Sequence, residues 1–153
     1  MKRSPFRQLI LLAAVAVLSV GCEHVDADNG DELDCNTPFV ASDYPAATVS
    51  FNNDIKPILA ANACSSIFCH GGEKPPSNFS VKTATDILGP GNEALQLEEC
   101  NVTRGKPEES YLIKKLEGAA GIIGERMPFG GGPIDPTQLE TIRQWIIEGA
   151  RDN

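Results

Sequence analysis

Apolar residues occur along this 153-residue chain in one unbroken run near the N-terminus and in separate helix-spaced stripes after residue 50. The unbroken run covers Leu9–Leu18 and follows the basic residues Lys2, Arg3 and Arg7. It is too short for a comfortable membrane span, and a basic start followed by a short apolar run and small residues is typical of an export signal. We therefore expect residues 1–21 to be a signal peptide.

The first stripe predicts a helix in "SFNNDIKPILAANAC", residues 50–64. Ser50 or Asn53 can cap this helix, and Pro57 is tolerated only near its first turn. The apolar residues at i, i+4, i+7 and i+8 place one face against a core; they are Phe51, Ile55, Ile58 and Leu59.

A second helix is expected in "KPEESYLIKKLEG", residues 106–118, with Pro107 at its first position and Gly118 at its end. Shorter helical turns are expected at residues 85–88 and 92–98. No segment shows the alternation of apolar and polar residues that a half-buried strand requires. The pattern therefore predicts an all-α fold.

The last stripe lies in "DPTQLETIRQWIIEGA", residues 135–150. Asp135 is the expected N-cap, Pro136 the first helical residue, Gln138 the partner in a capping box, and Gly149 the end of the helix. The apolar stripe of this helix consists of Leu139, Ile142, Trp145 and Ile146. This segment has the clearest helical pattern in the chain.

The segment between the export signal and the first stripe is acidic, with seven Asp and Glu residues and no Lys or Arg in residues 22–49. Like charges extend such a segment, and it has little apolar periodicity. We expect residues 22–49 to be a flexible tether that holds a single domain, residues 50–153, away from a membrane.

Charge excludes one class of partner. Removal of the first 21 residues takes away three of the 13 Lys and Arg residues and none of the 21 Asp and Glu residues, which leaves a formal net charge of −11. Phosphate backbones repel so acidic a chain, and no basic stripe offsets that repulsion. Nucleic-acid binding is therefore not expected, whereas solubility or docking of a basic partner explains the charge.

Cys22 follows the sequence "LSVG", which resembles the end of a bacterial lipoprotein signal. The resemblance implies that Cys22 becomes a lipidated N-terminus and anchors the chain on the periplasmic side of a bacterial membrane; ordinary cleavage nearby is the alternative. Four cysteines then remain in an oxidising compartment: Cys35, Cys64, Cys69 and Cys100. They are compatible with two disulfides or with one thioether pair and one disulfide.

The stretch "CSSIFCHGG", residues 64–72, ends like the covalent haem-attachment motif C-x-x-C-H, but it has four residues between its cysteines. On a helix, residues i and i+3 lie about 60° apart, whereas i and i+5 lie about 140° apart. If both thiols join one porphyrin, Ser65–Phe68 has to leave helical geometry and bulge. The alternative is a Cys64–Cys69 disulfide turn beside a surface histidine, His70.

Met127 bears on this choice, because it lies between Arg126 and Pro128 in the glycine-rich loop "GERMPFGGGPI". Such a loop is a poor place for a core methionine and a good place for a side chain directed inward. A thioether ligand opposite His70 would complete a six-coordinate haem iron of raised potential. A small domain with 14 glycines and 11 prolines in the whole chain also needs a cofactor, a metal or disulfides to stabilise its core.

Residues 51–151, with "FNNDIKPIL", "CHGG" and "RMPFGGGPIDPTQLETIRQWIIEGA" in this order, resemble the small c-type cytochrome domains of exported bacterial proteins. The resemblance implies a cytochrome c-like fold with crossing first and last helices and one haem c. Cys64 and Cys69 would carry the thioethers, and His70 and Met127 the iron. It also implies a non-enzymatic monomer that exchanges electrons with redox partner proteins. The departure from the family is the C-x4-C-H spacing. The remaining cysteines, Cys35 and Cys100, are expected to pair.

Three other interpretations account for parts of this pattern. The first is a haem-free structural or interaction domain, stapled by Cys64–Cys69 and Cys35–Cys100 disulfides. The second is a zinc site of Cys64, Cys69, His70 and Cys100, which has suitable ligand types but unusual spacing. The third, a thioredoxin-like redox enzyme, would need a C-x-x-C dithiol in a βαβ context.

Overall fold

The structure is a computed structural model, and it describes residues 33, 35 and 37–153. The predicted signal peptide, the lipidation site Cys22 and most of the predicted tether lie outside the described residues. Within the described part, no helix is long and apolar enough to cross a membrane.

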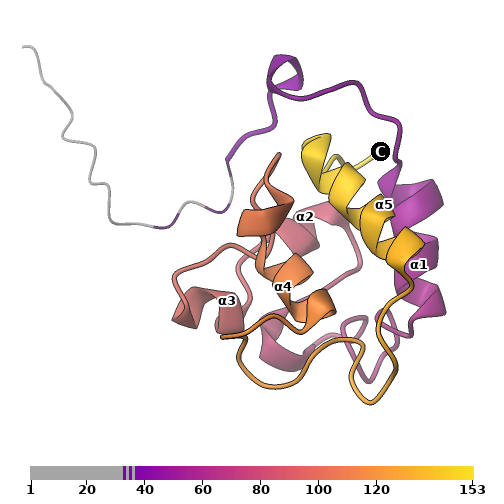
Figure 1. Ribbon diagram of the computed structural model, residues 1–153, viewed down its shortest axis with the longest axis vertical. Coiled ribbons are helices and arrows are strands. Elements are labelled where there is room, and N and C mark those ends of the chain that lie inside the picture. Colours follow the sequence, from indigo (N-terminus) through magenta and orange to yellow (C-terminus); the bar gives the residue numbers. More distant parts are fainter. Residues whose placement is uncertain (1–32, 34, 36) are drawn as a thin grey trace, which may run out of the picture. The chain divides into compact units, whose positions relative to one another are not determined.

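The described residues form helices and turns without a strand, in agreement with the expected all-α class. The α-helices, labelled in Figure 1, are α1 (Lys56–Ala61), α2 (Ala84–Leu88), α3 (Asn92–Gln96), α4 (Tyr111–Glu117) and α5 (Pro136–Ile147). A π-helical turn covers Phe51–Ile55, and short 3₁₀ turns cover Ala41–Asp43, Pro76–Asn78 and Pro107–Glu109. Most of the helices are only one or two turns long, so the chain between them builds much of the domain.

The first predicted helix begins where the sequence indicates, but its first turn is a π-helix. The Ser50 hydroxyl accepts a hydrogen bond from the Asn53 amide at 3.2 Å, as expected of an N-cap. Phe51, Ile55 and Leu59 are buried, while Ile58 is only partly buried against the core.

The last predicted helix is α5, and its two ends agree with the sequence. The Asp135 carboxylate accepts hydrogen bonds from the Thr137 and Gln138 amides at 2.9 and 3.2 Å, and Gly149 ends the helix with a φ of +90°. Gln138 does not complete the expected capping box; its side-chain oxygen accepts a hydrogen bond from Asn62 at 2.8 Å. The contact between Gln138 and Asn62, which follows α1, thus takes the place of the expected capping interaction within α5.

The helix expected over residues 106–118 is interrupted. Pro107 starts a separate 3₁₀ turn, and α4 begins only after Ser110. The Ser110 hydroxyl donates to the Lys106 carbonyl at 2.9 Å and accepts from the Thr103 amide at 2.9 Å. These bonds hold the extended backbone of Ser110, which separates the two pieces. Gly118 ends α4 in the left-handed conformation, as predicted.

The core joins the start of the domain to its end. Phe51 packs on Trp145 with 5.6 Å between ring centroids, and the Asn52 amide donates to the Asn153 carbonyl at 2.9 Å. Helix α5 contacts both the π-helical turn and α4 (Figure 1). The other buried apolar residues of this cluster include Ile55, Ile87, Val102, Ile113, Ile142 and Ile146.

From Cys35 onward, the segment predicted to be a flexible tether is linked to the domain. Cys35 is joined to Cys100 in a disulfide, with 2.13 Å between the sulfur atoms. The Glu148 carboxylate accepts hydrogen bonds from the Thr48 and Val49 amides, each at 2.9 Å, and Arg151 donates to the Pro45 carbonyl at 2.6 Å. Residues 37–49 therefore follow the domain rather than extend from it.

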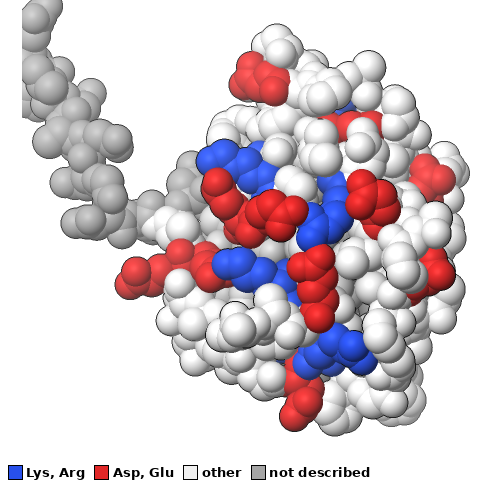
Figure 2. Space-filling view, in the orientation of Figure 1, with Lys and Arg blue, Asp and Glu red and all other residues white. Residues whose placement is uncertain are grey.

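The surface of the domain carries charges of both signs. On the face shown in Figure 2, acidic and basic side chains lie next to each other over the described residues. Arg143 pairs with Glu108 and Glu117, and Lys114 pairs with Glu99 at 2.8 Å. Each of these ion pairs neutralises acidic side chains locally.

Candidate functional site

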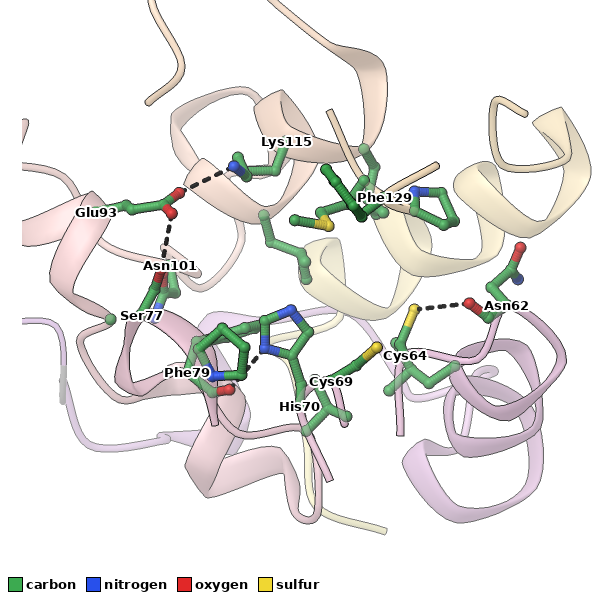
Figure 3. A pocket seen from close by; sticks show the side chains of 18 of the residues that line it. Asn62, Cys64, Cys69, His70, Ser77, Phe79, Glu93, Asn101, Lys115 and Phe129 are labelled. Carbon is green, nitrogen blue, oxygen red and sulfur yellow. Dashed lines mark hydrogen bonds and ion pairs between the residues drawn. The ribbon is translucent and has the colours of Figure 1, made fainter. Parts of the chain in front are cut away.

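One cavity of about 400 Å³ opens on the domain surface and is lined mostly by apolar side chains. It collects residues from the end of α1, the loop after it, residues 76–81, α3, α4 and the loop after α4 (Figure 3). Cys64, Cys69, His70 and Met127 all line it. The structure thus brings together the four residues that the sequence proposes as a site, although Met127 lies 57 positions after His70.

The four residues between the two cysteines bulge, the conformation that the sequence requires if both thiols are to join one porphyrin. The Cys64 amide donates to the Leu59 carbonyl at 2.8 Å, and the His70 amide donates to the Cys64 carbonyl at 2.9 Å. The second bond brings the ends of the segment together and pushes the residues between them outward. Ile67 and Phe68 are consequently 73% and 86% exposed.

Two glycines after the histidine allow this bulge to close. A Cβ atom on Gly71 would lie 2.0 Å from the Ser65 carbonyl oxygen, and one on Gly72 would lie 2.6 Å from the Ile67 carbonyl oxygen. Real Cβ atoms do not approach backbone so closely, so neither position accepts a side chain in this conformation. The bulge is therefore a packed loop whose path depends on Gly71 and Gly72.

The imidazole of His70 is held by one backbone hydrogen bond. Its Nδ1 lies 2.9 Å from the Phe79 carbonyl oxygen, and the Phe79 ring lies edge-on at 5.1 Å between centroids (Figure 3). A carbonyl only accepts, so Nδ1 carries a proton, and in the neutral imidazole Nε2 is then the atom whose lone pair can bind a metal.

The two thiols at the cavity are free in the structure. Burial raises the pKa of the Cys64 thiol, and the nearby Cys69 raises it further. Cys64 also donates a weak hydrogen bond to the Asn62 carbonyl at 3.7 Å. The raised pKa of Cys64 differs from the lowered pKa that is typical of a nucleophilic redox cysteine.

Met127 reaches the cavity from the loop that follows α4. Its amide donates to the Lys115 carbonyl at 2.9 Å, which ties the loop to the last turn of α4. The side chain is partly buried against the core and lines the cavity together with Pro128 and Phe129. The loop therefore directs the thioether inward, as the sequence predicts.

Sequence reasoning missed a polar cluster on the cavity wall. Lys115, only 7% exposed, pairs with Glu93 at 2.9 Å and donates to the Ile123 carbonyl at 2.8 Å. Burial alone would raise the pKa of Glu93, but hydrogen bonds from Ser77, Lys115 and Tyr111 outweigh it and lower that pKa. The one sequence signal is that Lys115 lies four residues after Tyr111, on the buried side of α4.

The Cys35–Cys100 disulfide excludes the zinc set considered from the sequence, because Cys100 has no thiolate to offer and does not line the cavity. Among the described residues, no three His, Cys, Asp or Glu side chains come together as a metal site. The cavity offers instead one imidazole, one thioether and two thiols within an apolar lining.

Comparison with protein-family models, with curated proteins and with solved structures gives no match for this chain. The chemistry of the cavity is therefore the evidence for its role.

Proposed function

We propose that the domain is a c-type cytochrome that binds one covalent haem and transfers electrons. The observation that carries the proposal is the convergence of Cys64, Cys69, His70 and Met127 on one apolar cavity. This combination is specific: the first two can form thioethers, and the last two are the axial pair of a closed, electron-transferring haem iron.

The residues present fit such a group. The hydrogen bond from Nδ1 to the Phe79 carbonyl leaves Nε2 of His70 as the ligand atom and fixes the orientation of the ring. Met127 lines the same cavity from another loop. Cys64 and Cys69 are free thiols, as attachment to two vinyl groups requires. An apolar lining suits the faces of a porphyrin.

A haem bound here would supply an iron that gains and loses one electron. The chain's own residues would hold and tune it: His70 and Met127 would ligate the iron, and the apolar wall would limit the access of water. With two side chains holding the iron, a substrate would have no free place on the metal. We therefore propose an electron carrier and not an enzyme.

The fold and cellular setting belong to the same proposal. Contact between the first helical segment and α5 supports a cytochrome c-like arrangement. The start of the sequence supports export and a lipid anchor on Cys22, which would place the domain on the periplasmic side of a bacterial membrane as a monomer that meets redox partner proteins. Its acidic charge supports the absence of nucleic acid among the partners.

The alternative is a haem-free domain stapled by disulfides. The Cys35–Cys100 disulfide suits this alternative, since it would stabilise a small domain in either case. In that case Cys64 and Cys69 would form a second disulfide, His70 would be a structural residue, and the apolar cavity would have no purpose of its own.

Covalent haem attachment tests the proposal. The chain is produced in a bacterial host with haem-attachment machinery, denatured, and analysed by a haem stain and by intact mass. A Cys64→Ala/Cys69→Ala variant is the control, because it keeps His70 and Met127 but has no attachment thiol. The expected result is one haem on the native chain and none on the variant. A native mass equal to the bare chain less two hydrogens per disulfide would refute the proposal.

A further inference from the structure

Two aromatic side chains stand at the mouth of the cavity and are largely exposed to solvent. Phe68 from the bulge is 86% exposed, and Phe129 from the loop after α4 is 73% exposed. Both nevertheless line the cavity. Ile67, next to Phe68 and also 73% exposed, does not line it.

The position of Phe68 is fixed by the local backbone. The Cys69 and Gly71 amides both donate to the Ser66 carbonyl at 3.0 Å. Gly71 also lies against Ser65 without room for a side chain. These contacts hold the backbone on both sides of Phe68, whose side chain lines the cavity.

Phe129 is placed in a comparable way. It follows Met127 and Pro128, which also line the cavity, and the Gly131 amide closes a turn onto the Pro128 carbonyl at 3.3 Å. Phe68 directly precedes Cys69, and Phe129 follows Met127 and Pro128. An aromatic ring therefore lies beside a proposed haem-binding residue in both loops.

We infer that Phe68 and Phe129 cover the edge of the bound haem. The four-residue bulge then forms part of the cavity wall and does more than separate the two cysteines. The inference rests on the proposed function. A phenylalanine buries a large apolar area when it is covered, which favours a flat apolar ligand between two such rings. The rings would exclude water from the haem edge.

Exclusion of water from the haem edge should change the reduction potential in a predictable direction. The oxidised haem carries one more positive charge than the reduced haem, and a less polar surrounding disfavours the more charged state. Phe68 and Phe129 should therefore raise the reduction potential. Ile67, which faces solvent in the same bulge, should have no such effect.

Side-chain footprinting tests the inference directly. The mature chain is compared with and without attached haem; the haem-free form is made without the attachment machinery and kept reduced. Hydroxyl-radical oxidation is then mapped by mass spectrometry. Oxidation of Phe68 and Phe129 should fall several-fold on haem attachment, while that of Ile67 stays unchanged.

Equal oxidation of Phe68 in both forms, or equal protection of Ile67, would overturn the inference while the haem stain still supports the proposed function. A chain that never acquires haem would overturn both. The second measurement is the reduction potential of the loaded Phe68→Ala and Ile67→Ala variants. We expect a lower reduction potential for Phe68→Ala and not for Ile67→Ala. Equal potentials in the two variants would contradict the proposed role of Phe68.

Discussion

Glu148 lies just after α5 with its carboxylate buried, and the hydrogen bonds it accepts predict a strong dependence of stability on pH. The side chain is 1% exposed. It accepts from the Thr48 and Val49 amides at 2.9 Å each, from the Gln144 amide group at 2.8 Å, and from the Thr48 hydroxyl. Burial by itself would raise the pKa of Glu148, but these bonds outweigh it and lower the pKa from 4.5 to about 2.

The shift converts into a stability difference. A depression of about 2.5 pKa units corresponds to about 3 kcal/mol of the free energy of unfolding when the carboxylate is ionised. Because the pKa is lower in the folded state, this stability is fully present above the unfolded pKa. It is lost as the pH falls from about 4.5 to about 2.

Glu148→Gln removes the negative charge. It also places a side-chain NH2 group, which is a donor, among the backbone amides and the hydroxyl that donate to the native carboxylate. We expect it to reduce the free energy of unfolding by about 3 kcal/mol at pH 7 and by much less at pH 2, where the pH has reached the pKa of the folded carboxylate and it is about half protonated. Urea denaturation followed by circular dichroism, at pH values from 2 to 7, measures this difference. Glu140→Gln, the same change at an exposed position of α5, is the matched control.

Two outcomes would refute the reasoning. In the first, Glu148→Gln and Glu140→Gln have the same unfolding midpoint at pH 7. In the second, the destabilisation caused by Glu148→Gln is as large at pH 2 as at pH 7, which would mean that packing and not ionisation is responsible.

Three further predictions follow from other parts of the domain. In the haem-loaded protein, Met127→Ala should lower the reduction potential by on the order of 100 mV, because a thioether stabilises reduced iron; an unchanged potential in redox titration would refute the axial assignment. Gly71→Ala should destabilise the domain by about 2 kcal/mol or more in urea denaturation, since its Cβ would meet backbone at 2.0 Å, whereas Gly132→Ala, with open space around it, should not. Equal midpoints would contradict the packed bulge. Replacing Cys35 and Cys100 by serine opens a link across 65 residues and should destabilise the chain by about 4 kcal/mol; the same midpoint as the oxidised native chain would be evidence against the disulfide.

Helix ends were predictable from the sequence because capping joins groups a few residues apart. Ser50, Asp135 and Gly118 act as the local pattern indicates. The failures occur where a side chain has a distant partner. Gln138 bonds to Asn62 instead of capping its own helix, and Ser110 is held by the preceding loop, which divides the helix expected over residues 106–118.

The same difference between local and distant contacts applies to the candidate site. Cys64, Cys69 and His70 are close in sequence, and Met127 is conspicuous in its loop, so their types and spacing were enough to propose a common site. The Glu93–Lys115 pair was not foreseen, because the position of Lys115 on the buried side of α4 does not identify its distant partner Glu93.

The sequence by itself determined the all-α class and the helix ends, since each follows from backbone geometry over a short stretch; it required a bulge between Cys64 and Cys69 only if both thiols join one porphyrin. Only the tertiary structure decided that Met127 shares a cavity with His70, that the Phe79 carbonyl orients the imidazole, and that the acidic segment attaches to the domain at Cys35 and near Glu148. The physical reason is the same in each case. These contacts join residues far apart in the chain, and their partners are chosen by the packing of the whole domain and not by the neighbours in sequence.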